Sequence, residues 1–310
     1  MNSEPVVWVV TPVYNGARFL RECIDSVLAQ TYGNWRYTIV DNKSTDETAE
    51  IAREFAARDP RISVSENNEF LPIMQNWNHA LRQMPDDAKY CKVVHADDTL
   101  FPECLERMVE VSEQNPSVGI VTSYALWGRE VRHLGVPYPQ QVVNGHAICR
   151  ATLEGRSYVF GSPSSLLLRA DVVRNRSMFY NEDNLHADTE VCFDVLRTTD
   201  LAFVHQILTR TRIHDEAMSS FTERINSAHD GWLRILARYG PVYLDRAEYA
   251  RQLRTKLGRY GVFLLKAVLK GKVRDARFRA HHRATFAYAL QLSLRRNGDV
   301  APPPLPVAGE

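Results

Sequence analysis

The stretch Tyr90-Cys91-Lys92-Val93-Val94-His95-Ala96-Asp97-Asp98-Thr99 joins a run of strand-forming residues directly to two adjacent carboxylates. An amphipathic segment follows Pro102, so we predict a buried strand with acids at its carboxyl end. Ligands bind at this end of the strands in open α/β sheets. Adjacent Asp97 and Asp98 repel each other unless a cation or hydrogen-bond donor lies between them. A divalent cation, Mg²⁺ or Mn²⁺, is one interpretation, and a helix N-cap is the other.

Three strand–helix units precede this stretch. Apolar runs at 6–10, 36–40 and 62–64 each end in a turn and are followed by helical spacing of apolar residues. We expect Ser44 or Thr45 to cap the second helix, which runs to about Arg58. Alternation of this kind predicts an α/β fold with a mostly parallel sheet flanked by helices. The strand ends at Thr11-Pro12, at Asp41 and at Asp97-Asp98 should then meet in one crevice.

No glycine-rich phosphate loop follows any of these strands. Neither GxGxxG nor GxxxxGK[ST] occurs at the turns, which disfavours a nicotinamide-dependent dehydrogenase and a P-loop NTPase. A metal on Asp97 and Asp98 would be another way to neutralise the phosphates of a nucleotide.

The second half is more irregular. We expect a strand at 118–123, a strand or hairpin near 126–134, a short helix near 145–154, a strand at 166–168 and a strand pair at 201–204 and 207–213. An acid-rich stretch, 181–190, runs into a helix that begins near Asp188. Asp188 is either an N-cap or a functional acid, and His214 is either a structural histidine or part of a site.

The composition is that of an ordinary globular protein. The net charge of +1 gives no general attraction to nucleic acid, and we expect no nucleic-acid partner. The five cysteines are widely spaced without a CxxC pair, which favours reduced thiols. The first residues do not resemble a signal peptide, and no window has the ~18 apolar residues of a membrane span. We therefore expect a cytoplasmic protein.

Five motifs in order resemble family 2 glycosyltransferases of the GT-A fold, which is Rossmann-like. They are Thr11-Pro12-Val13-Tyr14-Asn15, Val40 to Thr48, His95-Ala96-Asp97-Asp98, Ala187-Asp188-Thr189-Glu190-Val191 and Arg212-Ile213-His214. The match extends over about residues 6–220. It implies transfer of a sugar from a nucleotide diphosphate sugar, with a UDP-sugar as first choice, to an acceptor hydroxyl with inversion at the anomeric carbon.

The resemblance also implies roles for individual residues. Binding of the nucleotide sugar falls to Thr11, Pro12, Tyr14, Asn15, Asp41, Asn78 and Asp97. Asp97, Asp98 and His214 would hold Mn²⁺ or Mg²⁺. Asp188 would be the general base, with Glu190 as its substitute. The chain departs from many family members at His95, where an acid is common, and at Asp41-Asn42-Lys43-Ser44, where Asp-Asp-Gly-Ser is common.

The chemistry of such a transfer agrees with these residues. An inverting displacement needs a carboxylate that takes the proton of the acceptor hydroxyl. The departing diphosphate needs a Lewis acid on its other side. One acid cannot serve both ends, so two separated acid sites are expected, and Asp97-Asp98 and Asp188 are those two sites.

The last third is helical and basic. Between Arg251 and Arg296 the chain carries many Lys and Arg residues and one acid, Asp275. We predict a glycosyltransferase domain at 1–217, with a nucleotide-sugar half (1–123) and an acceptor half (124–217), a basic helical extension at 218–298 and a disordered tail at 299–310. The extension either packs on the core or lies at a membrane surface, with contact through 251–296.

These alternatives lead to different partners and places in the cell. A membrane-bound extension would imply a lipid-linked sugar acceptor and association with the inner face of the plasma membrane. An extension packed on the core would be compatible with any glycan acceptor. The expected process is synthesis of cell-surface polysaccharide or glycolipid. A nucleotidyltransferase and a non-catalytic sugar-nucleotide-binding module are the two other interpretations of the chain.

Overall fold

The first part of the chain alternates strands and helices. The computed structural model describes residues 4–132, 135–215 and 217–294. Its first elements are β1 (Val6–Val13), α1 (Ala17–Leu28), β2 (Trp35–Asp41), α2 (Thr48–Arg58), β3 (Ile62–Glu66), α3 (Ile73–Leu81), β4 (Ala88–Val93), β5 (Thr99–Leu100) and α4 (Cys104–Gln114). The predicted strand–helix order of this part is therefore observed.

The middle and last parts contain shorter strands and then helices alone. The middle elements are β6 (Val118–Trp127), β7 (Glu130–Arg132), β8 (Val142–Val143), α5 (Gly145–Leu153), the 3₁₀ turn η1 (Pro163–Ser165), β9 (Leu167–Arg169), α6 (Ala170–Arg174), α7 (Ala187–Val195) and β10 (Asp200–Thr211). The final elements are α8 (Met218–Ile225), α9 (Ala228–Tyr243), α10 (Arg246–Leu269), the 3₁₀ turn η2 (Lys272–Arg274) and α11 (Ala276–Leu294).

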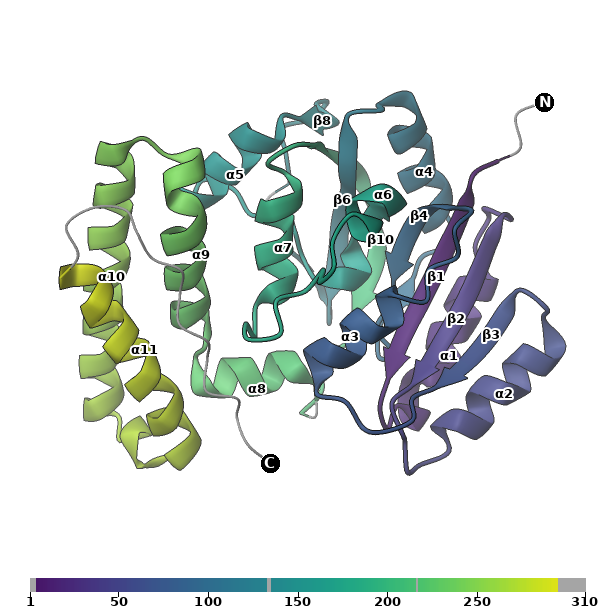
Figure 1. Cartoon of the computed structure of the whole chain (residues 1–310), viewed down its shortest axis with the longest axis horizontal. Helices are drawn as coiled ribbons and strands as arrows, with labels where there is room; N and C mark the ends of the chain where they lie inside the picture. Colours follow the sequence, from purple (N-terminus) through teal and green to yellow (C-terminus); the bar gives the residue numbers. More distant parts are fainter. Residues whose placement is uncertain (1–3, 133–134, 216, 295–310) are drawn as a thin grey trace.

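One mixed sheet, flanked by helices on both faces, organises the molecule (Figure 1). Its strand order is β3-β2-β1-β4-β9-β6-β10-β5, with β7 paired to β6 and β8 to β10. β1 runs parallel to β2 and β4, β2 to β3, and β6 to β10. The short strands β5, β7, β8 and β9 are antiparallel to their neighbours. The sheet is thus parallel in its long strands and mixed overall.

The position of β1 in the centre of the sheet explains the continuous apolar sequence of residues 6–10. Trp8 and Val10 belong to the apolar cluster on one face, and Val7 and Val9 belong to the cluster on the other. A strand covered on both faces needs apolar residues at every position, whereas a strand with one wet face would alternate. The carboxyl end of β1 lies beside those of β2 and β4, so the three predicted strand ends do meet.

Three details of the sequence prediction are wrong. The strand pair at 201–213 is one strand, β10, whose register against β6 shifts between Val204 and Ile207 and again before Thr209. The strand predicted at 118–123 is longer and continues to Trp127, where it enters the hairpin with β7 that was predicted near 126–134. α2 has no side-chain cap from Ser44 or Thr45. Each error comes from tertiary contacts, because register shifts, the point at which a strand ends and loop-to-loop bonds depend on distant partners.

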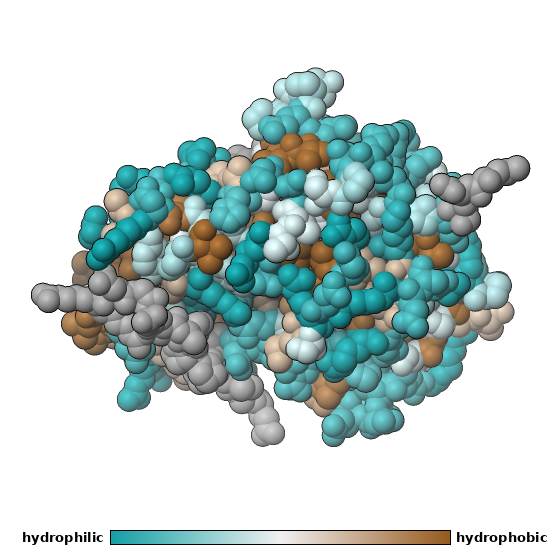
Figure 2. Space-filling view, turned by 45° about the horizontal axis from the view of Figure 1, so that its top comes forward, coloured by the Kyte–Doolittle hydropathy of each residue, from teal (hydrophilic) through white to brown (hydrophobic). Residues whose placement is uncertain are grey.

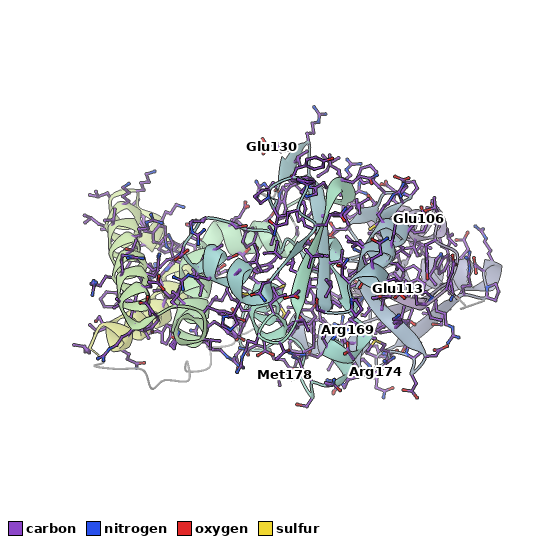
Figure 3. All side chains as sticks on the ribbon, turned by 90° about the horizontal axis from the view of Figure 1, so that it is seen from above. Glu106, Glu113, Glu130, Arg169, Arg174 and Met178 are labelled. Atoms are coloured by element: carbon purple, nitrogen blue, oxygen red, sulfur yellow. The ribbon has the colours of Figure 1, made fainter. Side chains whose placement is uncertain are left out.

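Two arginines fix the antiparallel insertion between β4 and β6. Arg169 Nη1 donates to the carbonyl oxygens of Pro116 and Val118, at 2.7 and 3.1 Å. Arg174 Nη2 donates to the carbonyl oxygen of Ala88 at 2.9 Å. Both arginines lie on the same side of the molecule in the view from above (Figure 3). They hold β9 and α6 to the two halves of the sheet, so the site elements before and after β9 keep one geometry.

The C-terminal helices divide into an inner and an outer part. α9 places Ile235, Leu236, Tyr239 and Tyr243 in the same apolar cluster as Trp8 of β1. α10 and α11 form a separate cluster with Leu233 of α9, and they lie at the end of the molecule farthest from β2 and β3 (Figure 1). Among the described residues, no helix has the length and apolarity to cross a bilayer. The predicted tail at 299–310 lies outside the described residues.

The face of the molecule seen in Figure 2 is mostly hydrophilic, and apolar residues appear on it as separate groups.

Candidate functional site

A large cavity opens at the carboxyl ends of the central strands. Its volume is about 1540 Å³. Pockets for one drug-sized ligand measure roughly 300 to 1000 Å³, so there is room for two substrates. The lining includes Pro12, Tyr14 and Asn15 after β1, Asp97 and Asp98 after β4, Asp188 on α7, and His214 after β10. Residues from all five sequence motifs therefore line the cavity, and Asn42 represents the motif Val40 to Thr48.

Two loops cross-link to form one wall of this cavity. The N–H of Asn15 donates to Ser44 Oγ at 2.9 Å, and Asn15 Oδ1 accepts the N–H of Thr45 at 2.8 Å. Asn15 has φ 50°, a left-handed conformation that Asn tolerates better than most residues. Ser44 and Thr45 serve this loop junction, which explains why neither caps α2.

Gly16 lets the same loop approach the acidic turn after β4. A Cβ atom at Gly16 would lie 2.5 Å from Val13 Cγ2 and 3.3 Å from Ala96 Cβ. Only glycine avoids these contacts. The loop after β1 and the acidic turn are therefore packed as one unit.

Aromatic side chains form a second wall. Tyr14 and Phe70 meet edge to face with ring centroids 4.8 Å apart, and both rings are about half exposed. Trp77 packs against His95 at 4.6 Å. Half-exposed aromatic rings at a cavity mouth are suited to stacking on a flat base or the apolar face of a sugar.

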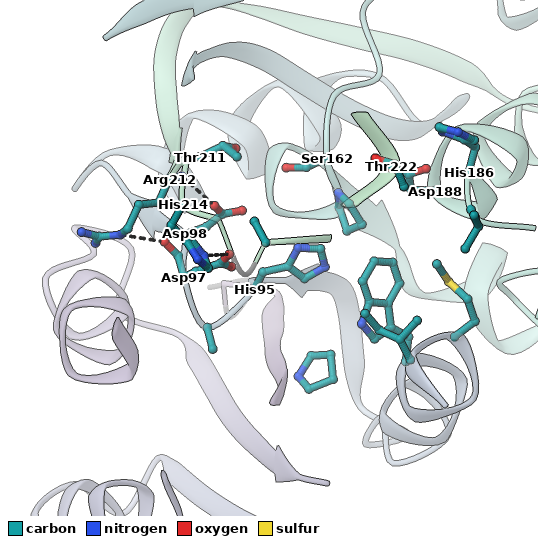
Figure 4. A pocket seen from close by; sticks show the side chains of 18 of the residues that line it. His95, Asp97, Asp98, Ser162, His186, Asp188, Thr211, Arg212, His214 and Thr222 are labelled. Carbon is teal, nitrogen blue, oxygen red and sulfur yellow. Dashed lines mark hydrogen bonds and ion pairs between the residues drawn. The ribbon is translucent and has the colours of Figure 1, made fainter. Parts of the chain in front are cut away.

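The acidic turn gathers ligand atoms of the type that a divalent cation binds. Donor atoms of His95, Asp97 and Asp98 lie within 4.8 Å of one another. His214 Nε2 lies 2.9 Å from Asp97 Oδ2, and the N–H of Arg212 donates to Asp98 Oδ1 at 3.2 Å. Figure 4 shows these side chains on one side of the cavity. His214 therefore reaches the acidic turn across 117 residues of sequence.

The electrostatics of this turn favour a cation. Burial, and then the charge of Asp97, raises the pKa of Asp98 to about 8. Burial lowers the pKa of His95, so its imidazole is neutral and able to ligate a metal. His95 Nε2 and His214 Nδ1 are buried without a hydrogen-bond partner among the described residues. Two crowded carboxylates and imidazole nitrogens without a described partner fit a divalent ion such as Mn²⁺.

Asp188 lies on the other side of the cavity, in the first turn of α7 (Figure 4). Burial raises its pKa, and the nearby His186 partly opposes that shift. His186 Nε2 in turn contacts Ser227 Oγ of the α8–α9 connection at 3.0 Å. A carboxylate with a raised pKa in a cavity is a candidate proton acceptor.

Four predicted site residues are not among the described residues that line the cavity: Thr11, Asp41, Asn78 and Glu190. Thr11 Oγ1 donates to the Val94 carbonyl oxygen at 2.7 Å, within the sheet. Asp41 Oδ2 accepts the N–H of Ser44 at 3.1 Å, while its Oδ1 is buried without a described partner. Both residues thus stabilise the loops at the strand ends without lining the cavity.

Asn78 and Glu190 support the segment that carries Asp188. The Asn78 amide donates to the Tyr180 carbonyl oxygen and accepts the Tyr180 N–H, both at 2.8 Å. Glu190 is buried and pairs with Arg238 at 2.6 Å. Its other oxygen accepts from Asn184 at 2.6 Å. Glu190 is thus fully engaged on the far side of α7, which favours Asp188 as the residue that faces the cavity.

Some lining residues had no signal in the sequence. Phe70 follows β3 in a stretch without a motif, and Thr222, Glu223, Asn226 and His229 belong to the helical extension. His95 also lines the cavity, and its place two residues before Asp97 is the signal for it in the sequence. The extension residues could not have been found, because only the tertiary packing of α8 and α9 brings them to the cavity.

The comparison with known sequences defines the class of protein. Residues 8–173 match the family described as "Glycosyl transferase family 2". The chain belongs to glycosyl transferase family 2, so the family predicted from the five motifs is confirmed, and the enzyme class it defines is that of a glycosyltransferase.

Two curated relatives have the same family character. The chain is 32% identical to "Putative glycosyltransferase EpsE" of Bacillus subtilis over 167 residues, which are 52% of this chain and 59% of the relative. It is 27% identical to an "Uncharacterized glycosyltransferase" of Haemophilus influenzae over 231 residues, 71% of this chain and 69% of the relative. The match thus spans less than two thirds of the Bacillus protein.

Solved structures confirm the GT-A fold. The crystal structure of S. aureus TarS 1-349 in complex with UDP-GlcNAc has a TM-score of 0.67 at 17% identity, covering 93% of this chain and 81% of that chain. The mannosyltransferase PcManGT from Pyrobaculum calidifontis in complex with GDP-Man and Mn²⁺ has a TM-score of 0.56 at 16% identity, covering 93% and 88%. A longer TarS structure is covered to 49% of its length.

Proposed function

We propose that this protein is a metal-dependent, inverting glycosyltransferase that moves a sugar from a UDP-sugar to a hydroxyl of a glycan or lipid-linked sugar. The observation that carries the proposal is the presence of two separate acid sites in one cavity, at Asp97-Asp98 and at Asp188 (Figure 4). An inverting displacement requires this arrangement, because the base and the departing diphosphate stand on opposite sides of the reacting carbon.

The donor end is built around the acidic turn. His95, Asp97 and Asp98 would hold Mn²⁺ or Mg²⁺, with His214 beside them, and the ion would stabilise negative charge on the departing diphosphate. Pro12, Tyr14 and Asn15 line the adjoining wall, where the nucleoside would bind, and Asp41 would act from beneath it through its unpartnered oxygen. The two nucleotide complexes of fold neighbours support a UDP-sugar first and a GDP-sugar second.

The acceptor end is built around Asp188. Its carboxylate would take the proton of the acceptor hydroxyl as the hydroxyl oxygen forms the new glycosidic bond. The raised pKa makes it a stronger base than an exposed aspartate. His186 would partly oppose the effect of burial on this carboxylate.

A pair of variants separates the two ends. We expect Asp98→Ala to lose metal-dependent nucleotide binding, whereas Asp188→Asn should keep binding and lose transfer by about 10²- to 10⁴-fold. Asp183→Asn is the matched control, because Asp183 is an exposed acid in the segment before α7. Equal loss of nucleotide binding in the Asp98 and Asp188 variants would contradict the division of roles.

The donor is identified by thermal stability. Melting temperatures are measured with UDP, GDP, dTDP, CMP and their sugars, each with and without Mn²⁺. A shift with one nucleoside diphosphate that needs Mn²⁺ would support the proposal. Binding of a nucleotide sugar by the wild type without hydrolysis or transfer would support a non-catalytic module instead.

The process proposed for this reaction is the synthesis of cell-surface polysaccharide or glycolipid, carried out on the cytoplasmic side. This place implies association with the inner face of the plasma membrane.

A further inference from the structure

The outer surface of α10 exposes apolar side chains near its C-terminal end. Val262, Leu265, Val268 and Leu269 are 55, 63, 56 and 79% exposed. With about 100° per residue, positions 262, 265 and 269 lie on one face of the helix, and 268 lies next to them. Soluble monomers seldom expose such a contiguous group without a partner for it.

Basic residues flank these side chains. Lys266 lies on the same part of α10 and Lys270 directly follows its end. Lys272 and Arg274 lie in the 3₁₀ turn η2, and Arg277 lies in the first turn of α11. We call these nine residues the basic–apolar tip: Val262, Leu265, Lys266, Val268, Leu269, Lys270, Lys272, Arg274 and Arg277.

Asp275 does not neutralise the tip effectively, because its carboxylate caps the N-terminus of α11. Asp275 is the one acid between residues 251 and 294. Its Oδ1 accepts the N–H of Phe278 at 3.0 Å and so caps α11. The tip therefore presents five bases around an apolar centre against a single carboxylate.

The tip lies next to the mouth of the cavity. Lys272 Nζ donates to Asn226 Oδ1 at 2.9 Å, and Asn226 lines the cavity. His282 of α11 contacts the Ile225 carbonyl oxygen through Nε2 at 2.7 Å. The end at which α10 passes into α11 is also the end along which α8 runs (Figure 1). Any surface that the tip contacts is thus close to the part of the cavity formed by the extension.

We propose that the basic–apolar tip docks on a bilayer surface rich in anionic lipid, so that the cavity receives an acceptor sugar carried on a lipid. The apolar side chains enter the boundary between headgroups and acyl chains, and the bases pair with lipid phosphates. The inference rests on the proposed function for its acceptor, but the docking itself is measured without donor or acceptor.

The charge pattern distinguishes a membrane from two other occupants. A second copy of the chain would bring two sets of five bases face to face, which is unfavourable. A nucleic acid would satisfy the bases and leave Val262, Leu265 and Leu269 in water. Of these three occupants, the anionic bilayer matches both the charge and the apolar centre.

The test is sedimentation of the full chain with vesicles of phosphatidylcholine alone and of phosphatidylcholine with phosphatidylglycerol. We expect binding to the second vesicle only. The double variant Lys266→Glu/Lys270→Glu should weaken it by about tenfold or more, since each base near an anionic surface contributes about 1 kcal/mol. Leu265→Ser/Leu269→Ser should weaken it as well.

The matched control is Arg251→Glu/Arg254→Glu, which makes the same charge change on exposed positions near the other end of α10. It should bind the anionic vesicles nearly as well as the wild type. Equal loss in both charge variants, or equal binding to both vesicles, would overturn the assignment of the tip.

Light scattering without vesicles measures whether a second copy of the chain occupies the tip instead. A dimer that Leu265→Ser/Leu269→Ser converts to a monomer would overturn the proposal in favour of self-association. UDP binding of the tip variants should equal that of the wild type, because the acidic turn is unchanged. A failure of donor binding in all proteins would count against the proposed function and leave the vesicle result standing.

Discussion

Lys92 is a fully buried lysine on the strand that leads to the acidic turn, and its replacement by methionine should stabilise the protein. Its Nζ contacts Met108 Sδ at 3.6 Å, a weak acceptor. Among the described residues, no carboxylate lies within 4.0 Å of this nitrogen. Burial lowers the pKa of Lys92, and the attraction of Cys104 and Asp98 only partly opposes this. The ammonium therefore costs folding free energy.

The expected gain can be estimated from this weak hydrogen bonding, which the sulfur atoms of Met108 and Cys104 provide. A buried polar group without a good partner costs about 1 to 3 kcal/mol in proteins. Methionine has nearly the length of lysine, so Lys92→Met removes this cost without leaving a cavity. We expect the free energy of unfolding to rise by about 1 to 3 kcal/mol and the melting temperature by several degrees.

The pH dependence of stability gives an independent check. The unfolded state keeps its proton up to the ordinary lysine pKa of 10.5, whereas the folded state releases it earlier. Wild-type stability thus increases as pH rises between the lowered folded pKa and 10.5. Lys92→Met lacks this rise, so its advantage over the wild type should shrink toward alkaline pH.

Chemical denaturation at several pH values measures both effects. Lys89→Met is the control, since Lys89 lies on the same strand but is half exposed and pairs with Glu113 at the surface. It should change stability by no more than about 0.5 kcal/mol. A loss of more than about 1 kcal/mol in Lys92→Met would refute the reasoning and would mean that Asp98 or Cys104 holds the ammonium favourably.

Three further predictions concern the site. Gly16→Ala should weaken UDP binding at least tenfold in a calorimetric titration, because its Cβ would push the loop away from Ala96, while Gly33→Ala, with open space around it, should bind normally. The rate constant kcat, measured at saturating donor and Mn²⁺, should rise with pH through the raised pKa of Asp188, about tenfold per unit below that pKa; a flat acid limb would exclude Asp188 as the base. Asn78→Ala should lower the free energy of unfolding by about 1 to 3 kcal/mol in urea, because it leaves backbone groups of the loop before α7 unpaired, and unchanged stability would contradict the role given to that amide.

The fold was predictable where one strand or helix carries its own pattern. β1 is apolar from Val6 to Val10 because both of its faces are covered, and this is visible in the sequence. The elements that failed, β10 and the start of α2, depend on partners far away in the chain. A register shift against β6 has no counterpart in the local pattern of 201–213.

The sequence located most residues that line the cavity, but it did not predict the contacts that each of them makes. The acidic turn, Tyr14, Asn15, Asp188 and His214 all reach the cavity, because strand ends in such a sheet converge. Motif membership did not distinguish residues that face the cavity from those that support it. Glu190 has the chemistry of a base, but its ion pair with Arg238 from α9 decides its role.

That ion pair also bears on how far the protein can be shortened. Arg238 neutralises a buried carboxylate on α7, and neighbouring positions of α9 fill the apolar cluster that contains β1. A recombinant fragment that stops at 217, the predicted boundary, would lose both the ion pair and the α9 side chains that cover this apolar cluster. A fragment that ends after Leu244 keeps both. α9 is therefore an integral part of the fold around the sheet, and α10 adds to it through the ion pair of Glu248 with Arg150.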